Sequence, residues 1–333
     1  MSTVIEAAVT DTIPLSVEQT VPRSLVHKRS LENVFLTEVR PRGENHFVCA
    51  GRIPTVHRFF NDTGRTPQKD ILFYTELGQQ ASLAISHTFL GVSKEDIVVF
   101  EQSQAWMRDV AWRSGQHSTA DSVITEITIH ETETRKSKAV SRVVGEQIMS
   151  IGGQQVFHGM GAWTIQPAAL FRRLRKMSQQ NLQASTESPL QDVGFELSRL
   201  MHIVRDSVVI FVPISNVDRT QFVTSLIVDD THRYFFDHPC DHVPGMLLLE
   251  GCMQLAQAAV SKRTSVPRHQ IAVSAYDVDF RQFVECDAPV KMAAQFPEPP
   301  NKSDNRQPTN VEIAFSQKNV LCGTATVTVA FLN

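Results

Sequence analysis

Two glutamates lie inside nearly apolar stretches, and each is followed four residues later by a glutamine. The pairs are Glu76 with Gln80 and Glu250 with Gln254. Positions i and i+4 share one face of an α-helix, so each amide can hydrogen-bond its carboxylate. Burying a carboxylate without charge compensation raises its pKa, which suits proton transfer near neutral pH. Glu76 and Glu250 are therefore the predicted catalytic residues, oriented by the two glutamines; a solvent-facing glutamate is the alternative.

The helices that carry these pairs, predicted over 72–90 and 247–263, are apolar on almost every face, so other structure must enclose them. Segments with alternating polarity or β-branched residues predict antiparallel strands. The sequence thus predicts an α+β fold, a tandem hot-dog in which two curved antiparallel sheets each wrap a central helix and pair to cover exposed edges. The predicted strands are 35–39, 47–52, 122–130, 139–148, 155–165, 208–214, 221–228, 270–280, 290–296, 311–315 and 324–331.

The two halves repeat the same landmarks in register. Thirty residues separate His27 from His57 (57−27) and also His202 from His232 (232−202). His57 and His232 each begin a His-Arg-aromatic-Phe motif, 19 and 18 residues before the glutamates (76−57 and 250−232). Such self-similarity indicates repeated structural units. We predict a flexible N-terminal tail over 1–22, a first hot-dog repeat over 23–165, a linker over 166–198 and a second repeat over 199–333.

Other residues around the predicted helices are candidates for binding. His57 and His232 precede aromatic pairs that would wall a pocket, so we expect them to orient substrate; a packed structural histidine is the alternative. A basic run at Arg172, Arg173, Arg175 and Lys176 could dock an acidic carrier protein, or it could be the solvated end of a helix.

A turn dense in polar side chains, from Asp237 to Gly245, precedes the second helix. Free backbone N–H groups and the positive dipole end of the helix would cradle a thioester oxygen there, whereas an ordinary helix start is the alternative. Gly245 would let an acyl chain or pantetheine arm approach the backbone closely. No partner cluster with metal-ligand spacing occurs elsewhere, so no metal is predicted and the turn's side chains can serve as caps.

Composition narrows the functional classes. With 42% hydrophobic and 20% charged residues and a net charge of −3, the chain offers no electrostatic case for binding nucleic acid. The longest apolar stretch, Met246 to Val260, is too short and too interrupted by polar residues to cross a bilayer, so no membrane contact is expected. The first 22 residues lack the pattern of a signal peptide, which predicts a cytoplasmic protein.

These residues carry a resemblance to known enzymes. The pattern Pro244-Gly-x4-Glu250-x3-Gln254 resembles the helix start of hot-dog 3-hydroxyacyl-carrier-protein dehydratases, whose glutamate is catalytic. The string from Asp241 to Glu250, with His57-x-Phe-Phe, Val26-His27 and Phe171-Arg-Arg-Leu-Arg175, resembles the A-factor synthase family over about residues 24 to 332. That family comprises tandem hot-dog enzymes of actinomycete γ-butyrolactone signal biosynthesis.

The resemblance implies an acyltransferase. It would move a β-ketoacyl group from an acyl carrier protein thioester onto the hydroxyl of dihydroxyacetone phosphate, and aldol-type closure would give a phosphorylated butenolide, the precursor of a γ-butyrolactone or furan signal. No cofactor is implied. A dehydratase or thioesterase on the same fold, and a noncatalytic acyl-ligand-binding protein, remain alternatives.

The resemblance also implies site residues. Glu76 and Glu250 match the family's helix glutamates, and we expect Glu250→Ala to abolish activity and Glu76→Ala to reduce it. Asp241 and His242 fall in the family's turn motif, where they would bind substrate. The family carries arginine three residues after each glutamate, but Gln79 and Met253 stand there in this chain, so the phosphate has no assigned binding residue.

Overall fold

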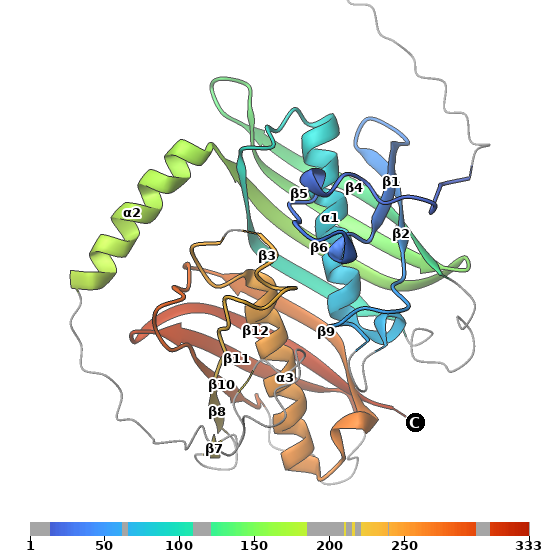
Figure 1. Cartoon of the computed structure of the whole chain (residues 1–333). Coiled ribbons are helices and arrows are strands. Elements are labelled where there is room, and N and C mark those ends of the chain that lie inside the picture. The colour runs from blue at the N-terminus through green and yellow to red at the C-terminus, as the bar shows by residue number, and fades with distance from the viewer. Residues whose placement is uncertain are drawn as a thin grey trace, which may run out of the picture.

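One antiparallel sheet of twelve strands forms the body of the computed structural model, which describes residues 14–61, 66–108, 121–184, 210, 215–216, 221–238, 240–297 and 307–332 (Figure 1). The strand order is β1-β2-β4-β5-β6-β3-β9-β12-β11-β10-β8-β7. The strands are β1 (Leu36–Pro41), β2 (His46–Arg52), β3 (Ile97–Met107), β4 (Ser122–Thr134), β5 (Val140–Ile151), β6 (Gln154–Gln166), β7 (Ser215–Asn216), β8 (Gln221–Ser225), β9 (Ile271–Phe280), β10 (Lys291–Gln295), β11 (Thr309–Gln317) and β12 (Val320–Phe331).

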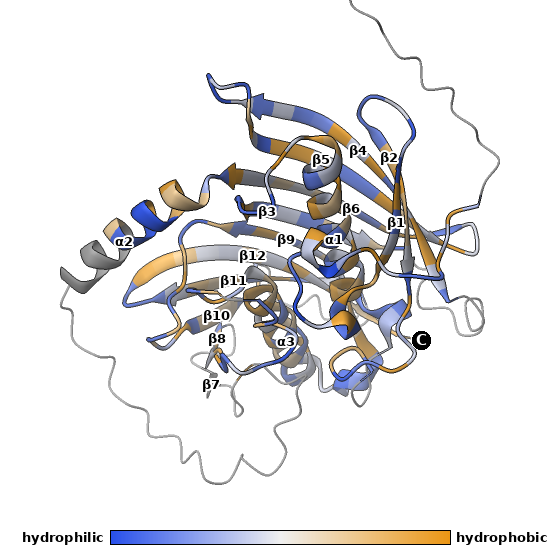
Figure 2. Ribbon diagram, turned by 45° about the horizontal axis from the view of Figure 1, so that its top comes forward, coloured by the Kyte–Doolittle hydropathy of each residue, from blue (hydrophilic) through white to orange (hydrophobic). Residues whose placement is uncertain are grey.

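Two long helices, α1 (Ile71–Phe89) and α3 (Gly245–Thr264), lie against the same face of this sheet (Figure 1). Both are buried on most sides, as their apolar sequences require. The strands beneath them alternate polar and apolar residues along their length (Figure 2), because one face meets the helices and the other meets solvent. Single-turn 3₁₀ helices lie at Arg23–Leu25, Leu31–Asn33, Pro67–Lys69 and Arg268–Gln270.

The two halves of the chain share the sheet through β3 and β9. These strands pair antiparallel, from Gln102 opposite Asp279 to Trp106 opposite Ala275. The pairing covers one edge strand of each half, as the edge argument predicted. The β3 strand itself was not predicted, although its start, Ile97-Val-Val-Phe100, has the β-branched and aromatic composition of a strand.

The predicted tandem hot-dog is confirmed, with one central helix in each half and a curved antiparallel sheet around it. The predicted linker, 166–198, contains the amphipathic helix α2 (Ala168–Ala184), which stands at the side of the sheet (Figure 1). The predicted domain boundaries stay predictions. His202 and most of the predicted strand 208–214 lie outside the described residues. No described helix is long and apolar enough to span a membrane.

Candidate active site

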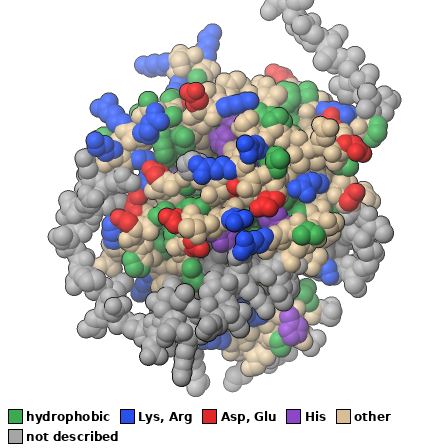
Figure 3. All heavy atoms as spheres, viewed as in Figure 1, with side chains coloured by type: hydrophobic (Ala, Val, Ile, Leu, Met, Phe, Trp, Pro, Cys, Tyr) green, Lys and Arg blue, Asp and Glu red, His purple; other side chains and the backbone are tan. Residues whose placement is uncertain are grey.

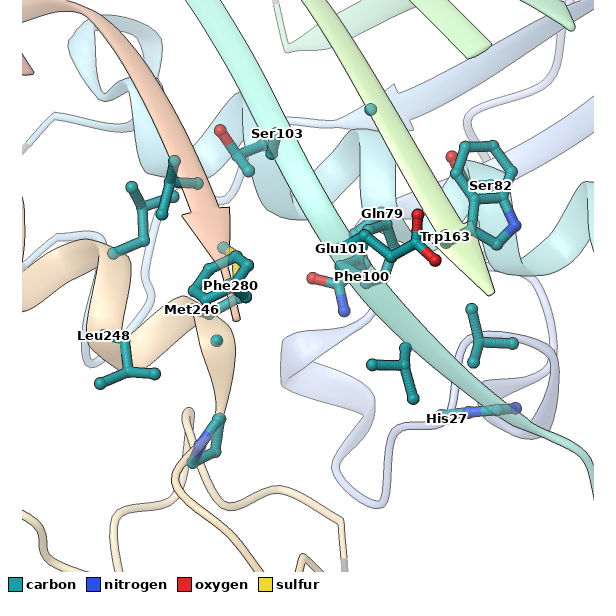
Figure 4. A pocket seen from close by; sticks show the side chains of 18 of the residues that line it. His27, Gln79, Ser82, Phe100, Glu101, Ser103, Trp163, Met246, Leu248 and Phe280 are labelled. Atoms are coloured by element: carbon teal, nitrogen blue, oxygen red, sulfur yellow. The ribbon is translucent and has the colours of Figure 1, made fainter. Parts of the chain in front are cut away.

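A cavity of about 890 Å³ lies between the two halves. The first half contributes residues on α1, on β3 and in the turn before β1, and the second contributes the turn before α3 and the first residues of that helix. Figure 4 shows His27 and Gln79 on one side of this cavity and Met246, Leu248 and Phe280 on the other. The polar residues that line it and concern the chemistry are His27, Lys28, Glu76, Gln79, Tyr234, His238, Asp241, His242 and Gly245.

Glu76 lines this cavity and is only 2% exposed. Lys28 places its Nζ 2.8 Å from Glu76 Oε1. Gln80 Nε2 donates to the same oxygen at 2.7 Å, and the Tyr234 hydroxyl donates to Oε2 at 3.1 Å. The carboxylate is therefore held by donors from three separate parts of the chain, including one from the second half.

These donors change the acidity that the sequence predicted. Burial raises the pKa of the Glu76 carboxyl, but the charge of Lys28 and the hydrogen bonds from Gln80, Lys28 and Tyr234 outweigh it, so the pKa lies below its usual value. The expectation of a raised pKa is wrong for Glu76, because the expected lack of charge compensation does not hold. Glu76 is an ionised carboxylate at neutral pH.

The predicted amide–carboxylate pairs are confirmed in both halves. Gln254 Nε2 donates to Glu250 Oε1 at 2.7 Å, as Gln80 does to Glu76. Gln80 also ties its helix to the start of β1, since its Oε1 accepts the N–H groups of Phe35 and Leu36. Glu250 is 2% exposed but, unlike Glu76, it does not line the cavity, and neither glutamine does.

Asp241 and His242 form a hydrogen-bonded pair at the cavity wall. His242 Nδ1 lies 2.7 Å from Asp241 Oδ1. Burial raises the pKa of Asp241, but the hydrogen bond from His242 and the charge of Arg175 outweigh burial, so the pKa lies below its usual value. The carboxylate is therefore ionised, and Nδ1–H of His242 donates to it. The pKa of His242 lies below its ordinary value, because burial outweighs the opposing effect of Asp241. At neutral pH this leaves the other ring nitrogen, Nε2, with a free lone pair.

Arg175 on α2 holds this turn in place. Its guanidinium donates to Asp241 Oδ2 at 3.1 Å and forms two 2.8 Å hydrogen bonds to Glu285. Arg175 is 3% exposed. The prediction of one basic surface run is wrong for this residue, because its side chain is buried and ion-paired. Arg172, Arg173 and Lys176 are exposed, and basic side chains gather over α2 at the left of Figure 3.

The start of α3 differs from that of α1. Asp70 caps α1 by accepting the N–H of Leu72 at 3.0 Å. Pro244 is the N-cap residue of α3, and its side chain makes no capping hydrogen bond. Gly245 lies on the cavity, where an added Cβ would come within 3.3 Å of the Phe280 ring. The N-terminal end of α3 thus meets the cavity, and no carboxylate of the described residues accepts from its first N–H groups.

The predicted substrate-orienting histidines support the cavity wall from behind. His57 Nδ1 accepts the backbone N–H groups of Phe59 and Phe60, and its Nε2 lies 2.9 Å from Asn33 Oδ1. His232 Nδ1 accepts the N–H groups of Tyr234 and Phe235 in the same manner. Neither histidine lines the cavity, but Tyr234 and Phe235 do. The direct substrate contact expected of both histidines stays a prediction.

Three of the cavity residues that concern the chemistry were not singled out from the sequence: Lys28, Tyr234 as a hydrogen-bond donor, and His238. Lys28 directly follows the Val26-His27 pair that carried part of the family resemblance. Its position next to this pair was the signal in the sequence that could have identified it. His238 was noted only as part of the polar turn. Among the residues that the structure describes, no three His, Cys, Asp or Glu side chains gather in a way that would hold a metal ion.

Comparison with known proteins decides the family. A family model described as AfsA, the A-factor biosynthesis hotdog domain, matches residues 10–144 and 197–333. The chain belongs to this family. One matched segment lies in each half of the chain, so the A-factor biosynthesis hotdog domain occurs twice, although the first segment ends within β5 and does not include β6. The resemblance drawn from the sequence is confirmed.

Two curated relatives of this A-factor family protein carry the name 2-oxo-3-(phosphooxy)propyl 3-oxoalkanoate synthase. The protein from Streptomyces virginiae is 29% identical over 290 residues, which are 86% of this chain and 91% of the relative. The protein from Streptomyces coelicolor is 25% identical over 278 residues, 82% of each chain. Among solved structures, the 12:0-ACP thioesterase from Umbellularia californica is similar with a TM-score of 0.51 and 10% identity, covering 88% of this chain and 100% of that one. This last likeness concerns the fold alone.

Proposed function

We propose that the chain transfers a 3-oxoacyl group from a carrier thioester to the hydroxyl of dihydroxyacetone phosphate. The product would be the 2-oxo-3-(phosphooxy)propyl 3-oxoalkanoate for which both curated relatives are named. One observation carries the proposal: a single cavity in a member of the A-factor family brings together the Asp241–His242 pair, the uncapped start of α3 and the ionised Glu76.

The Asp241–His242 pair fits the role of general base. Asp241 holds Nδ1–H of His242, so Nε2 can take the proton of the substrate hydroxyl as its oxygen attacks the thioester carbonyl. The carbon–sulfur bond then breaks, and the same proton passes from the imidazolium to the departing thiolate. The step therefore releases the free carrier thiol and the ester, and His242 returns to its neutral form.

The start of α3 fits the developing negative charge. As the hydroxyl attacks, the thioester oxygen becomes an oxyanion that needs donors. The first N–H groups of α3, at Gly245 and Met246, have no side-chain cap to compete with such an oxygen. The close packing of Gly245 on Phe280 keeps the backbone at the cavity surface, where a side chain would crowd Phe280.

Glu76 fits the ring closure. The carbon between the two carbonyls of the 3-oxo ester is acidic, and an ionised carboxylate can remove its proton. The resulting carbanion would attack the ketone carbon of the triose unit, and the Glu76 carboxyl would return its proton to the alkoxide that forms. Loss of this hydroxyl with the remaining α-hydrogen, as water, would give the phosphorylated butenolide. Glu250, the second predicted catalytic residue, stays a prediction with less support, because it does not line the cavity.

The carrier that delivers the thioester is proposed to be an acidic acyl carrier protein that docks on α2. This helix exposes Leu170 (44%), Leu174 (47%) and Met177 (54%) beside the basic residues Arg172, Arg173 and Lys176. Arg172 and Phe171 of the same helix line the cavity. A carrier bound to this mixed apolar and basic surface would hold its pantetheine arm close to the active site.

An incubation with a 3-oxoacyl carrier thioester, with and without dihydroxyacetone phosphate, tests the function. We expect mass spectrometry to detect the phosphorylated ester, or the butenolide derived from it, only when both substrates are present. Thioester hydrolysis at the same rate without the phosphate would indicate a thioesterase, and loss of water from a 3-hydroxyacyl thioester would indicate a dehydratase. Binding without turnover would indicate an acyl-ligand-binding protein.

A further inference from the structure

The cavity contains a group of nitrogen-bearing side chains that the proposed transfer does not use. His27 and Lys28 come from the turn before β1, and His238 comes from the turn before α3. All three line the cavity (Figure 4 labels His27). They lie near enough to one another for their charges to interact. Among the described residues, Glu76 is the only acidic cavity residue that forms an ion pair with any of them, and it pairs with Lys28.

Hydrogen bonding fixes the orientation of His27. His27 Nε2 lies 2.9 Å from His87 Nε2, and His87 Nδ1 lies 3.1 Å from the carbonyl oxygen of Val92. A carbonyl only accepts, so His87 carries its proton on Nδ1, and its neutral ring accepts at Nε2. His27 therefore donates through Nε2. Its second nitrogen, Nδ1, has no hydrogen-bond partner among the described residues.

His238 is also available to a ligand. No described residue hydrogen-bonds either nitrogen of its ring. Asp237 accepts the N–H groups of Ser30 at 3.0 Å and Arg29 at 3.3 Å. These hydrogen bonds join the turn that carries His238 to the turn that carries His27 and Lys28. The three side chains thus lie on one part of the cavity wall although they come from different halves.

The backbone conformation of His27 supports a functional role for this part of the cavity wall. Its φ of 52° lies in the left-handed region, which costs free energy for a residue with a side chain. Strained conformations of this kind occur preferentially at functional sites. In this chain the left-handed conformation occurs at His27, and both His27 and the next residue, Lys28, contribute side chains to the cavity.

We propose that His27, Lys28 and His238 form the subsite for the phosphate group of the triose phosphate, an assignment that rests on the function proposed above. His27 would donate through Nδ1–H and His238 through a ring N–H. Lys28 would donate from the protons of its ammonium that Glu76 does not engage. This subsite takes the place of the family arginine, where the chain has Gln79.

The charges balance in the bound state. Lys28 and Glu76 neutralise each other, so a phosphate dianion would be offset when His27 and His238 each take up one proton. Without ligand both histidines are neutral: burial, together with His87, His238 and Lys28, lowers the pKa of His27 to about 4. Burial and Lys28 likewise lower the pKa of His238 to about 4, aided by His242 and opposed by Glu76 and Asp237.

A phosphate reverses this balance, because an anion beside a histidine raises its pKa. Binding should therefore take up protons, to a maximum of two per site. The affinity should rise as the pH falls from 8 to 6, since the bound state holds more protons than the free state in this range. A subsite built from permanently charged arginines would show no proton uptake by the protein.

Calorimetry of the full chain with inorganic phosphate and with dihydroxyacetone phosphate, in two buffers of different ionisation enthalpy, measures this uptake. The double variant His27→Asn/His238→Gln should bind both ligands at least roughly tenfold more weakly and without proton uptake. Asparagine tolerates the left-handed backbone at position 27. His269→Gln, at an exposed histidine, is the matched control and should behave like the parent.

Steady-state kinetics separate the subsite from the proposed function. The double variant should raise the KM for dihydroxyacetone phosphate at least roughly tenfold and leave the KM for the thioester unchanged. An unchanged phosphate affinity in the double variant would overturn the subsite, and so would a loss seen only in Arg281→Met, which removes another basic side chain that lines the cavity. If the parent binds phosphate with proton uptake yet makes no ester, the subsite stands and the proposed function fails.

Discussion

Lys28 Nζ lies 2.8 Å from Glu76 Oε1, and this ion pair sets the charge state of the buried carboxylate. Lys28 is itself only 11% exposed, so little water screens the pair. Glu76 thereby remains ionised in an environment that would otherwise favour its protonated form. The basicity of Glu76 therefore depends on Lys28, which lies outside the Glu76 helix and could not be predicted from the residue pattern of that helix.

Removing this cation should shift the pH profile. In Lys28→Met, burial dominates and the pKa of Glu76 rises, so the carboxylate becomes protonated at pH values where the parent keeps it ionised. We expect the acid limb of kcat for butenolide formation, measured at saturating dihydroxyacetone phosphate, to move to higher pH. Lys28→Arg keeps the charge and is the control. Identical acid limbs in parent and Lys28→Met would show that the pair does not govern the reaction.

The two helix glutamates should differ in importance. Glu76→Gln removes a carboxylate that lines the cavity, and we expect butenolide formation to fall roughly 100-fold or more. Glu250→Gln alters a carboxylate that does not line it, and we expect a smaller loss. This order is the reverse of the one expected from the sequence. Turnover and thermal unfolding should be measured for both variants. A greater loss of activity in Glu250→Gln than in Glu76→Gln, with Glu250→Gln still folded, would contradict this order.

The Asp241–His242 pair should give a distinct pH signature. Asp241→Asn removes the hydrogen bond and charge that raise the pKa of His242, so this pKa falls further. The acid limb of ester formation should move to lower pH, and the plateau rate should drop roughly 100-fold because the base is weaker. His242→Gln should lose the limb altogether. A pH–rate profile that both variants leave untouched would assign the hydroxyl proton to another group.

Arg175 should matter for stability as well as for activity. Arg175→Met leaves the nearly buried Glu285 without its bidentate partner and frees the turn that carries Asp241. We expect a loss of about 3 kcal/mol in the free energy of unfolding, measured by urea denaturation, together with reduced kcat. Arg173→Met, on the exposed side of the same helix, should change the unfolding free energy by less than about 0.5 kcal/mol. Equal effects of the two substitutions would contradict the anchoring role.

The exposed surface of α2 should discriminate between carrier-bound and small thioesters. Reversing the charge of Arg173 and Lys176 to glutamate should raise the KM for the carrier-linked substrate roughly tenfold or more at low salt, and added salt should lessen this loss because it screens the new repulsion. The KM for a short N-acetylcysteamine thioester should stay unchanged, because Arg173 and Lys176, unlike Arg172, do not line the cavity. Reversal of Lys291 on β10 serves as a control for net charge. A parallel loss with both thioesters would place these residues in the active site and not at a docking surface.

The sequence by itself determined the two central helices and most of the strands around them, but not β3 or α2. Helices apolar on almost every face had to be enclosed, alternating strands could enclose them, and matching spacings in the two halves indicated a repeat. The amide–carboxylate pairs were also predictable, since positions i and i+4 of a helix are neighbours whatever surrounds them. These features depend on local backbone geometry, which a short window of residues fixes.

Only the tertiary structure decided which glutamate faces the cavity and what compensates its charge. Lys28, Tyr234 and Glu76 belong to three separate segments, and the pairing of β3 with β9 brings the two halves that carry them together. The same long-range packing buried Arg175 in a run that looked uniformly exposed. A pKa depends on distances and burial summed over all neighbours, so two halves with nearly equal motifs acquire different chemistry once they fold against each other.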